Sequence, residues 1–274
     1  MLRFIDEAAP QAAQAAAEAA AGLLRPQAAV SPKFFYDALG SRLFDAITEL
    51  DEYTPTRTEA ALMRTHGAAI VQTARAALGT PLTLVDLGAG SCSKAAALFE
   101  GLAPRRYLAV DISVEHLRQA LAALQRQHPG IEMWGLGLDF SEHLRLPPDA
   151  VLGRPLVFFP GSSIGNFDPP AALRLLREAR ALSDGAGLLI GVDRVKDPAR
   201  LQVAYDDALG VTAAFNLNLL RHLNRRLGTD FDPRQWRHVA LYDAAASCIE
   251  MHLEARVALT VRWPGCERHF AAGE

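Results

Sequence analysis

Residues 82–94, LTLVDLGAGSCSK, constrain the fold more than any other stretch of the chain. An apolar run leads into a glycine turn and a helical pattern, and a second apolar run at 107–113, YLAVDIS, contains Asp111. Gly88 and Gly90 allow a sharp turn and a close approach of the backbone to a ligand. An acidic residue at the end of the second strand can accept both hydroxyls of a ribose. The pattern therefore predicts a strand–turn–helix–strand unit that binds a nucleoside-type cofactor.

The glycine spacing narrows the choice of cofactor, although a G-x-G alone is also typical of ordinary turns. The third glycine of the dinucleotide motif and a G-x-x-x-x-G-K-[ST] stretch are both missing from the sequence, so neither NAD nor a P-loop nucleotide is supported. Asp86, at the end of the first strand, is typical of S-adenosylmethionine (SAM) sites. Asp139 and Phe140 follow the third predicted strand, where a carboxylate and a ring can hold an adenine. The sequence favours SAM or a similar nucleoside.

Charge and composition exclude several classes of partner. The 274 residues carry a net charge of −3, so we expect no nucleic-acid partner. Cys92, Cys248 and Cys266 are too few and too scattered for a disulfide framework or a C-x-x-C metal site. The eight histidines show no metal-ligand spacing. We therefore expect a small-molecule substrate and no metal.

The N-terminal residues, MLRFIDEAAPQ, carry charges and a proline, so they lack the apolar centre of a secretory signal. Nowhere does the sequence reach the roughly 18 uncharged apolar residues that a membrane helix needs. We expect a cytoplasmic protein without a membrane partner, and a monomer is favoured over an oligomer.

Strands and helices alternate through the middle of the chain, which predicts an α/β fold with a doubly wound parallel sheet. Ligands of such sheets bind beyond the carboxyl ends of the strands, where the glycine-rich loop 158–170, FFPGSSIGNFDPP, also lies. The predicted strands are 82–87, 106–111, 131–138, 155–159 and 186–193, and the predicted helices between them are 93–101, 113–127 and 170–183.

The flanking segments predict a second, α+β lobe that binds the substrate. Before the sheet we expect helices over 7–24, most of 31–59, and 60–77; after it, a long helix over 198–227 precedes strands at 237–243, 247–255 and 256–263. The expected domains are residues 1–60, the helical part of the substrate lobe; 61–197, the SAM-binding α/β core; and 198–274, the rest of the substrate lobe.

Several long blocks occur in the order of a known family, from about residue 31 to the last residue. They are KFFYDALGSRLFDAITELDEYTPTRTE, VDLGAGSCSK, FFPGSSIGNFDP, AYDDALGVTAAFNLNLL and IEMHL. Together they resemble the histidine-specific SAM-dependent methyltransferases of ergothioneine biosynthesis, which convert L-histidine into hercynine, its Nα-trimethylated betaine. The resemblance implies a Rossmann-like SAM-methyltransferase core with a second, substrate-binding lobe.

The resemblance also implies roles for individual residues. Tyr36 and Tyr53 are the expected catalytic residues, because neutral hydroxyls around a desolvated amine favour its reactive, uncharged form. Asn166 and Tyr205 are expected on the α-carboxylate of histidine, and Met251 in the imidazole pocket. The full sets are Gly88, Lys94, Asp111, Asp139 and Phe140 for SAM, and Tyr53, Gly161, Asn166, Tyr205 and Met251 for histidine.

The chain departs from the family at its end. The family continues with a T-E-x-S-type stretch that contacts the imidazole and with further strands of the sheet, whereas this sequence ends at Glu274. We therefore expect an unpaired sheet edge and a better retained affinity for SAM than for histidine. The alternatives are a methyltransferase of the same fold acting on another aromatic amino acid or amine, and an inactive SAM-binding protein. A nucleic-acid methyltransferase is less favoured, because the sequence lacks an NPPY-type motif.

Overall fold

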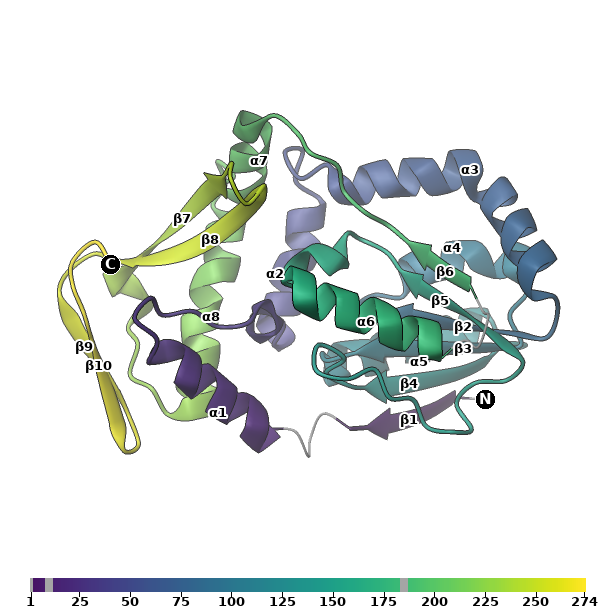
Figure 1. The fold of residues 1–274 in the computed structure, drawn as a ribbon, viewed down its shortest axis with the longest axis horizontal. Helices are drawn as coiled ribbons and strands as arrows, with labels where there is room; N and C mark the ends of the chain where they lie inside the picture. The colour runs from purple at the N-terminus through teal and green to yellow at the C-terminus, as the bar shows by residue number, and fades with distance from the viewer. Residues whose placement is uncertain (1, 8–11, 183–186) are drawn as a thin grey trace. The chain divides into compact units, whose positions relative to one another are not determined.

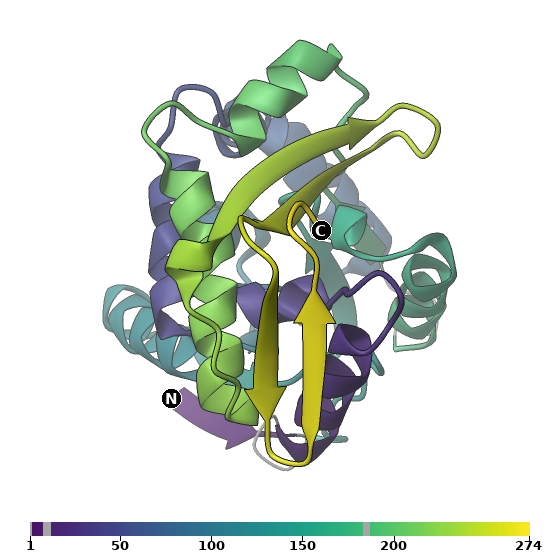
Figure 2. The same cartoon turned by 90° about the vertical axis from the view of Figure 1, so that its left-hand side faces the viewer.

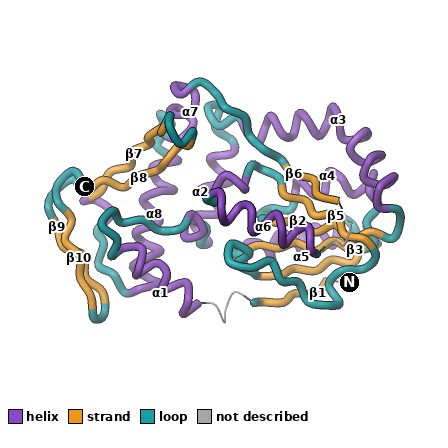
Figure 3. The backbone as a smooth tube through the Cα atoms, viewed as in Figure 1, coloured by secondary structure: helices purple, strands orange, loops and turns teal. Residues whose placement is uncertain are grey.

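The computed structural model describes residues 2–7, 12–182 and 187–274, which form two compact units (Figures 1 and 3). The first unit comprises residues 1–11 and 55–193, and the second comprises residues 12–54 and 194–274. The chain therefore passes between the units three times, and neither unit is a single continuous segment.

A six-stranded parallel sheet forms the centre of the first unit (Figure 1). The strand order reverses beside β2, because β3 and β4 extend the sheet on one side and β5 and β6 on the other. The carboxyl ends on either side of such a reversal form the usual ligand site of open α/β sheets. In spatial order the strands are β1 (Leu2–Asp6), β4 (Glu132–Gly137), β3 (Arg106–Asp111), β2 (Leu82–Leu87), β5 (Arg154–Phe159) and β6 (Gly187–Ile190).

Two apolar clusters cover the two faces of this sheet, which confirms the predicted doubly wound α/β fold. Along β2 the side chains alternate, so that Leu82 and Leu84 belong to one cluster and Val85 and Leu87 to the other. The first cluster includes side chains of α3 (Pro55–Leu78), α4 (Ser93–Leu102) and α5 (Val114–Gln127), and the second includes side chains of α6 (Pro169–Ala181), which lies across the sheet in Figure 1.

The strand β1 was not predicted, and it adds a sixth strand to the five expected. It pairs in parallel with β4, Leu2 opposite Met133, and Phe4 packs into the first cluster. A Cβ at Gly135 would lie 2.4 Å from the Phe4 ring, so the glycine leaves the space that this ring occupies. The charged Arg3 and Asp6 interrupt the apolar pattern by which the other strands were predicted. An edge strand such as β1 can carry them, because it is not covered on all sides.

The second unit packs helices around one core together with two strand pairs (Figure 2). Its strands are paired antiparallel, β7 with β8 and β9 with β10, and the second pair ends in a strand that the sequence analysis did not predict. The elements are α1 (Ala12–Leu23), η1 (Pro32–Phe35), α2 (Ala38–Thr48), α7 (Pro198–Tyr205), α8 (Val211–Leu227), η3 (Pro233–Gln235), β7 (Trp236–Asp243), β8 (Cys248–Ala255), β9 (Leu259–Trp263) and β10 (Cys266–Phe270).

The predicted continuous helix over 198–227 is wrong, because the chain breaks between α7 and α8. Gly210 has φ +74°, a left-handed conformation that ends a helical path. Asp207 stabilises the start of α8, because its carboxylate accepts hydrogen bonds from the backbone N–H groups of Val211 (3.0 Å) and Thr212 (2.8 Å). The break leaves Tyr205 as the last residue of α7.

Candidate cofactor and substrate site

The glycine turn after β2 rests on the end of the neighbouring strand. Gly88 has φ +70° and Gly90 has φ +50°, so both adopt backbone conformations that residues with a Cβ rarely take. The N–H groups of Gly88 and Ala89 donate to the Val110 carbonyl of β3, at 2.9 and 3.2 Å. A Cβ at Gly90 would meet nothing within 4 Å, which leaves room for a ligand against the backbone.

Asp111 ties this turn to the start of α5. Its Oδ2 accepts a hydrogen bond from the Gly90 N–H (2.8 Å) and its Oδ1 accepts one from the Ser113 N–H (2.8 Å). Burial raises the pKa of the carboxyl, and the two N–H donors oppose that rise. Each carboxylate oxygen has a second lone pair, so the group can still accept from ribose hydroxyls.

Asp139 and Phe140 follow β4, whose end lies beside that of β3, since the Leu138 N–H donates to the Asp111 carbonyl (3.1 Å). The tip of the Phe140 ring lies 3.9 Å from the position of a Cβ at Gly88. The same ring stacks on Phe167 at 6.3 Å between centroids. The Phe140 ring therefore lies beside the glycine turn, and its contact with an adenine stays a prediction.

These groups fit SAM. A carboxylate at the end of β3 suits a ribose. A carboxylate and an aromatic ring after β4 suit an adenine, and a lysine ammonium suits the carboxylate-bearing tail. Asp111, Asp139 with Phe140, and Lys94 are the residues that would hold these three parts.

Asp86 lies beneath the turn rather than facing it. It is 1% exposed, accepts a hydrogen bond from the Tyr107 hydroxyl (2.7 Å), and its Oδ1 has no hydrogen-bond partner among the described residues. Burial raises its pKa to about 7, and the adjacent Asp111 adds to the rise while Tyr107 and Lys94 oppose it. The same burial raises the pKa of the neighbouring Cys92 thiol to about 12. Asp86 is therefore a buried group whose described hydrogen bond goes to Tyr107 and not to the glycine turn.

Lys94 stands in the first turn of α4, and its ammonium lies 2.6 Å from Glu59 Oε2. Glu59 Oε1 accepts a hydrogen bond from the Gly161 N–H (2.7 Å), so the structure brings two predicted site residues to one carboxylate. Glu59 was not among the predicted site residues, because a lone glutamate in the second turn of a helix carries no local signal of such a role. Asn166 ends the short helix η2 (Ser163–Asn166) and is exposed.

In the second unit, three predicted tyrosines belong to one aromatic cluster. The Tyr53 ring meets the Tyr205 ring edge to face at 6.2 Å, and Phe44 lies 6.2 Å from Tyr53 and 5.6 Å from Tyr36. Met251 packs against the same core. The structure thus groups both predicted catalytic tyrosines with one predicted carboxylate-binding residue.

A histidine that the sequence analysis did not single out holds the end of α7. His238 Nε2 lies 2.7 Å from the Tyr205 carbonyl, and its Nδ1 lies 2.9 Å from Asn216 Nδ2. The Asn216 amide also donates to the His252 carbonyl (2.9 Å). Because an amide nitrogen only donates, His238 Nδ1 accepts from Asn216, and the His238 Nε2–H donates to the Tyr205 carbonyl oxygen. This bond fixes the backbone at Tyr205.

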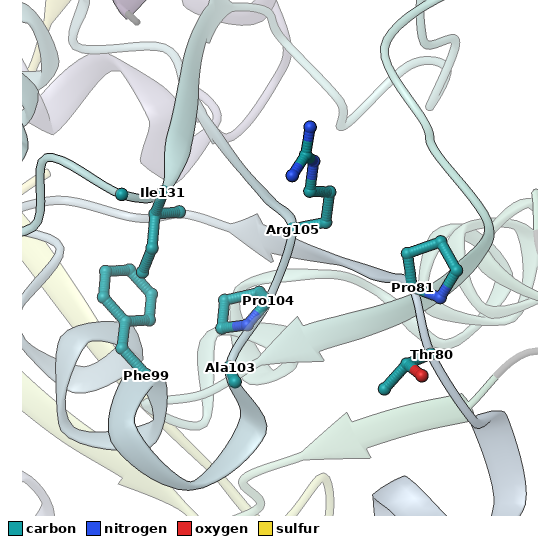
Figure 4. A pocket seen from close by; sticks show the side chains of 8 residues that line it. Thr80, Pro81, Phe99, Ala103, Pro104, Arg105 and Ile131 are labelled. Atoms are coloured by element: carbon teal, nitrogen blue, oxygen red, sulfur yellow. The ribbon is translucent and has the colours of Figure 1, made fainter.

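A separate cavity of about 640 Å³ lies at the other end of the sheet (Figure 4). Its walls come from the segments that precede β2, β3 and β4, so it opens at the amino ends of the strands. It contains none of the predicted site residues. The lining residues are Thr80, Pro81, Phe99, Ala103, Pro104, Arg105, Gly130 and Ile131.

The described residues contain neither a group of side chains suited to a metal ion nor a helix suited to a membrane. Among residues 2–7, 12–182 and 187–274, no three His, Cys, Asp or Glu side chains are grouped as a metal ion would require. Within the same ranges, every helix is too short or too polar to cross a membrane.

Comparisons with known proteins give one matching family model and several similar proteins. The family model described as histidine-specific, SAM-dependent methyltransferase matches residues 15–274. The histidine N-alpha-methyltransferase of Mycolicibacterium smegmatis is 46% identical, over 96% of this chain and 84% of that protein. The protein of the same name from Mycobacterium tuberculosis is 43% identical, over 85% and 72%. Ergothioneine biosynthesis protein 1 of Neurospora crassa is 31% identical, over 76% of this chain and 24% of its own length.

Proposed function

Because the chain belongs to the family of histidine-specific, SAM-dependent methyltransferases, we propose that it trimethylates the α-amino group of L-histidine to hercynine, the first step of ergothioneine biosynthesis. The observation that carries the proposal is the cluster of Tyr36, Tyr53 and Tyr205 in a family whose reaction needs an amine to lose its proton before each transfer.

SAM supplies a methyl group activated by the positive charge of its sulfonium. In our proposal Asp111 accepts from the ribose hydroxyls, Asp139 and Phe140 hold the adenine, and Lys94 pairs with the carboxylate of the cofactor. Asp111 also fixes the glycine turn through Gly90, so one side chain both shapes the site and binds in it. Methyl transfer is an in-line displacement, so most of the rate comes from positioning.

The tyrosines favour the neutral amine. An ammonium that leaves water for a buried site of uncharged hydroxyls loses its hydration, which lowers its pKa, so its proton leaves more easily. Tyr36 and Tyr53 supply such hydroxyls, and Tyr53 is only 9% exposed. We propose Tyr205, Asn166 and Gly161 as contacts of the amino-acid carboxylate, and Met251 as a contact of the imidazole.

Incubation of the protein with SAM and a panel of amino acids, followed by mass spectrometry, tests the proposal. A mass gain of three methylene units on histidine is expected. A gain on another aromatic amine would instead support a different substrate, and no gain together with retained SAM binding would indicate an inactive SAM-binding protein. The cytoplasmic location and the monomeric state remain predictions.

A further inference from the structure

Glu59 contacts two separate parts of the predicted site through its two carboxylate oxygens. Oε1 accepts the hydrogen bond from the Gly161 N–H (2.7 Å), and Oε2 lies 2.6 Å from the Lys94 ammonium. The Glu59 side chain is 14% exposed and that of Lys94 is 35% exposed. Glu59 therefore joins the first turn of α4 to the loop that follows β5.

The surrounding backbone leaves room for this pair. A Cβ at Gly191, just after β6, would lie 2.1 Å from Glu59 Oε1. A Cβ at Gly161, which has φ +77°, would lie 2.9 Å from the Lys94 ammonium. Two glycines thus stand where any other residue would displace the carboxylate or the ammonium.

Two hydrogen bonds, one of them to a side-chain hydroxyl, connect the same loop to the segment after β6. The Ser162 N–H donates to the Gly191 carbonyl (3.1 Å), and the Asp193 N–H donates to Ser162 Oγ (2.9 Å). Glu59 adds a third connection to this loop, from α3, and is the one that also reaches Lys94. Glu59 therefore provides a direct path of contacts from the Lys94 ammonium to the Gly161 backbone.

We propose that Glu59 is a positioning residue for methyl transfer, which holds the Lys94 ammonium and the Gly161 loop in one arrangement and thereby couples cofactor binding to substrate binding. The cofactor half depends on Lys94 contacting SAM, and the substrate half rests on the proposed function. A lysine side chain has much rotational freedom, and a short ion pair to a mostly buried carboxylate removes it before the ligand arrives.

The carboxylate is not what attaches α3 to the sheet. Met63, Val71, Ala74 and Leu78 of this helix pack into the apolar cluster on the first face of the sheet. A variant of Glu59 should therefore fold, and its thermal unfolding midpoint should stay close to that of the wild type. Changes in ligand binding can then be assigned to the site.

The first test is Glu59→Gln, which keeps an oxygen for the Gly161 N–H but removes the charge that pairs with Lys94. Loss of one charge-assisted contact predicts about a tenfold weaker affinity for S-adenosylhomocysteine by calorimetry. Glu115→Gln is the matched control, because it makes the same chemical change at an exposed position of α5 in the same unit. The control should bind like the wild type.

The second test displaces the carboxylate without altering it. Gly191→Ala should weaken S-adenosylhomocysteine binding about as much as Glu59→Ala, because the new methyl group takes the place of Oε1. In the Glu59→Ala background the same substitution should have little further effect, a non-additivity typical of groups in direct contact. Gly67→Ala, where a Cβ meets nothing within 4 Å, is the control.

Coupling is measured from histidine affinity with and without S-adenosylhomocysteine. We expect the wild type to bind histidine several-fold more tightly in its presence, and Glu59→Gln to lose most of this gain. Unchanged cofactor affinity in Glu59→Gln, or additive effects of Gly191→Ala and Glu59→Ala, would overturn the positioning role. A wild type that neither binds nor methylates histidine would overturn the proposed function and the coupling, while the cofactor measurements would still decide the role of Glu59 toward Lys94.

Discussion

The Tyr107 hydroxyl donates a 2.7 Å hydrogen bond to Asp86 Oδ2 beneath the glycine turn, where both side chains are almost wholly buried. Burial raises the pKa of Asp86 to about 7 from the model-peptide value of 3.8, and Tyr107 only partly offsets that effect. The folded protein therefore keeps a proton that the unfolded chain releases above about pH 4.

This proton predicts a pH dependence of stability that Asp86→Asn should abolish. A raised pKa stabilises the fold fully below about pH 4, and the contribution is lost as the pH rises to about 7. The wild type should thus lose on the order of 4 kcal/mol of unfolding free energy, relative to Asp86→Asn, as the pH rises from 4 to 8. Urea unfolding at both pH values measures the difference, and parallel pH profiles would contradict the prediction.

Asp111→Asn should weaken S-adenosylhomocysteine binding about tenfold or more, because the amide replaces one acceptor by a donor facing the Gly90 or Ser113 N–H. Calorimetry measures the affinity. Asp149→Asn serves as the control, since Asp149 is an exposed aspartate of the same unit that pairs with Arg3. An affinity loss of the same size in both variants would remove the special role of Asp111.

Tyr36→Phe and Tyr53→Phe should lower the rate of histidine methylation without abolishing it. If the hydroxyls only favour the neutral amine, the loss should stay below the roughly 100- to 10,000-fold that follows removal of a general base. Single-turnover kinetics at saturating SAM and histidine measure it. Complete loss of turnover with both ligands still bound would mean that one tyrosine acts as the base.

His238→Gln should raise the KM for the amino-acid substrate several-fold and leave S-adenosylhomocysteine affinity unchanged. The His238 side chain is 2% exposed and donates to the Tyr205 carbonyl, so its loss frees the end of α7 that carries a predicted substrate contact. His252→Gln, on the neighbouring strand, is the control, because Asn216 uses the backbone carbonyl of His252 and not its side chain. Equal effects of the two substitutions would argue against a role for His238.

The elements predicted most accurately from sequence are those with strong apolar patterns. Residues 82–87 and 106–111 agree with β2 and β3 to the residue, because strands covered on both faces are nearly continuous apolar runs. The strand β1 and the break after α7 were missed, since pairing with β4 and capping by Asp207 depend on distant or conformational partners. The left-handed Gly210 lies in this break, directly before α8.

The sequence predicted which residue types form the site better than it predicted the contacts between them. The fold class, the family and the use of SAM are confirmed, whereas the individual site residues remain predictions. Glu59 and His238 could not be found from sequence, because each acts on a residue far along the chain. Their partners, Gly161 and Tyr205, were found through the resemblance alone.

The pairing of Leu2 with Met133 has a consequence for how the protein forms during synthesis. β1 leaves the ribosome more than a hundred residues before β4, its partner in the sheet, and until then its Phe4 and Ile5 lack the apolar surfaces that bury them. Contacts between such distant segments form slowly. The nascent chain therefore carries an unpaired strand for more than a hundred residues of synthesis, and this strand can dock only once β4 has been made.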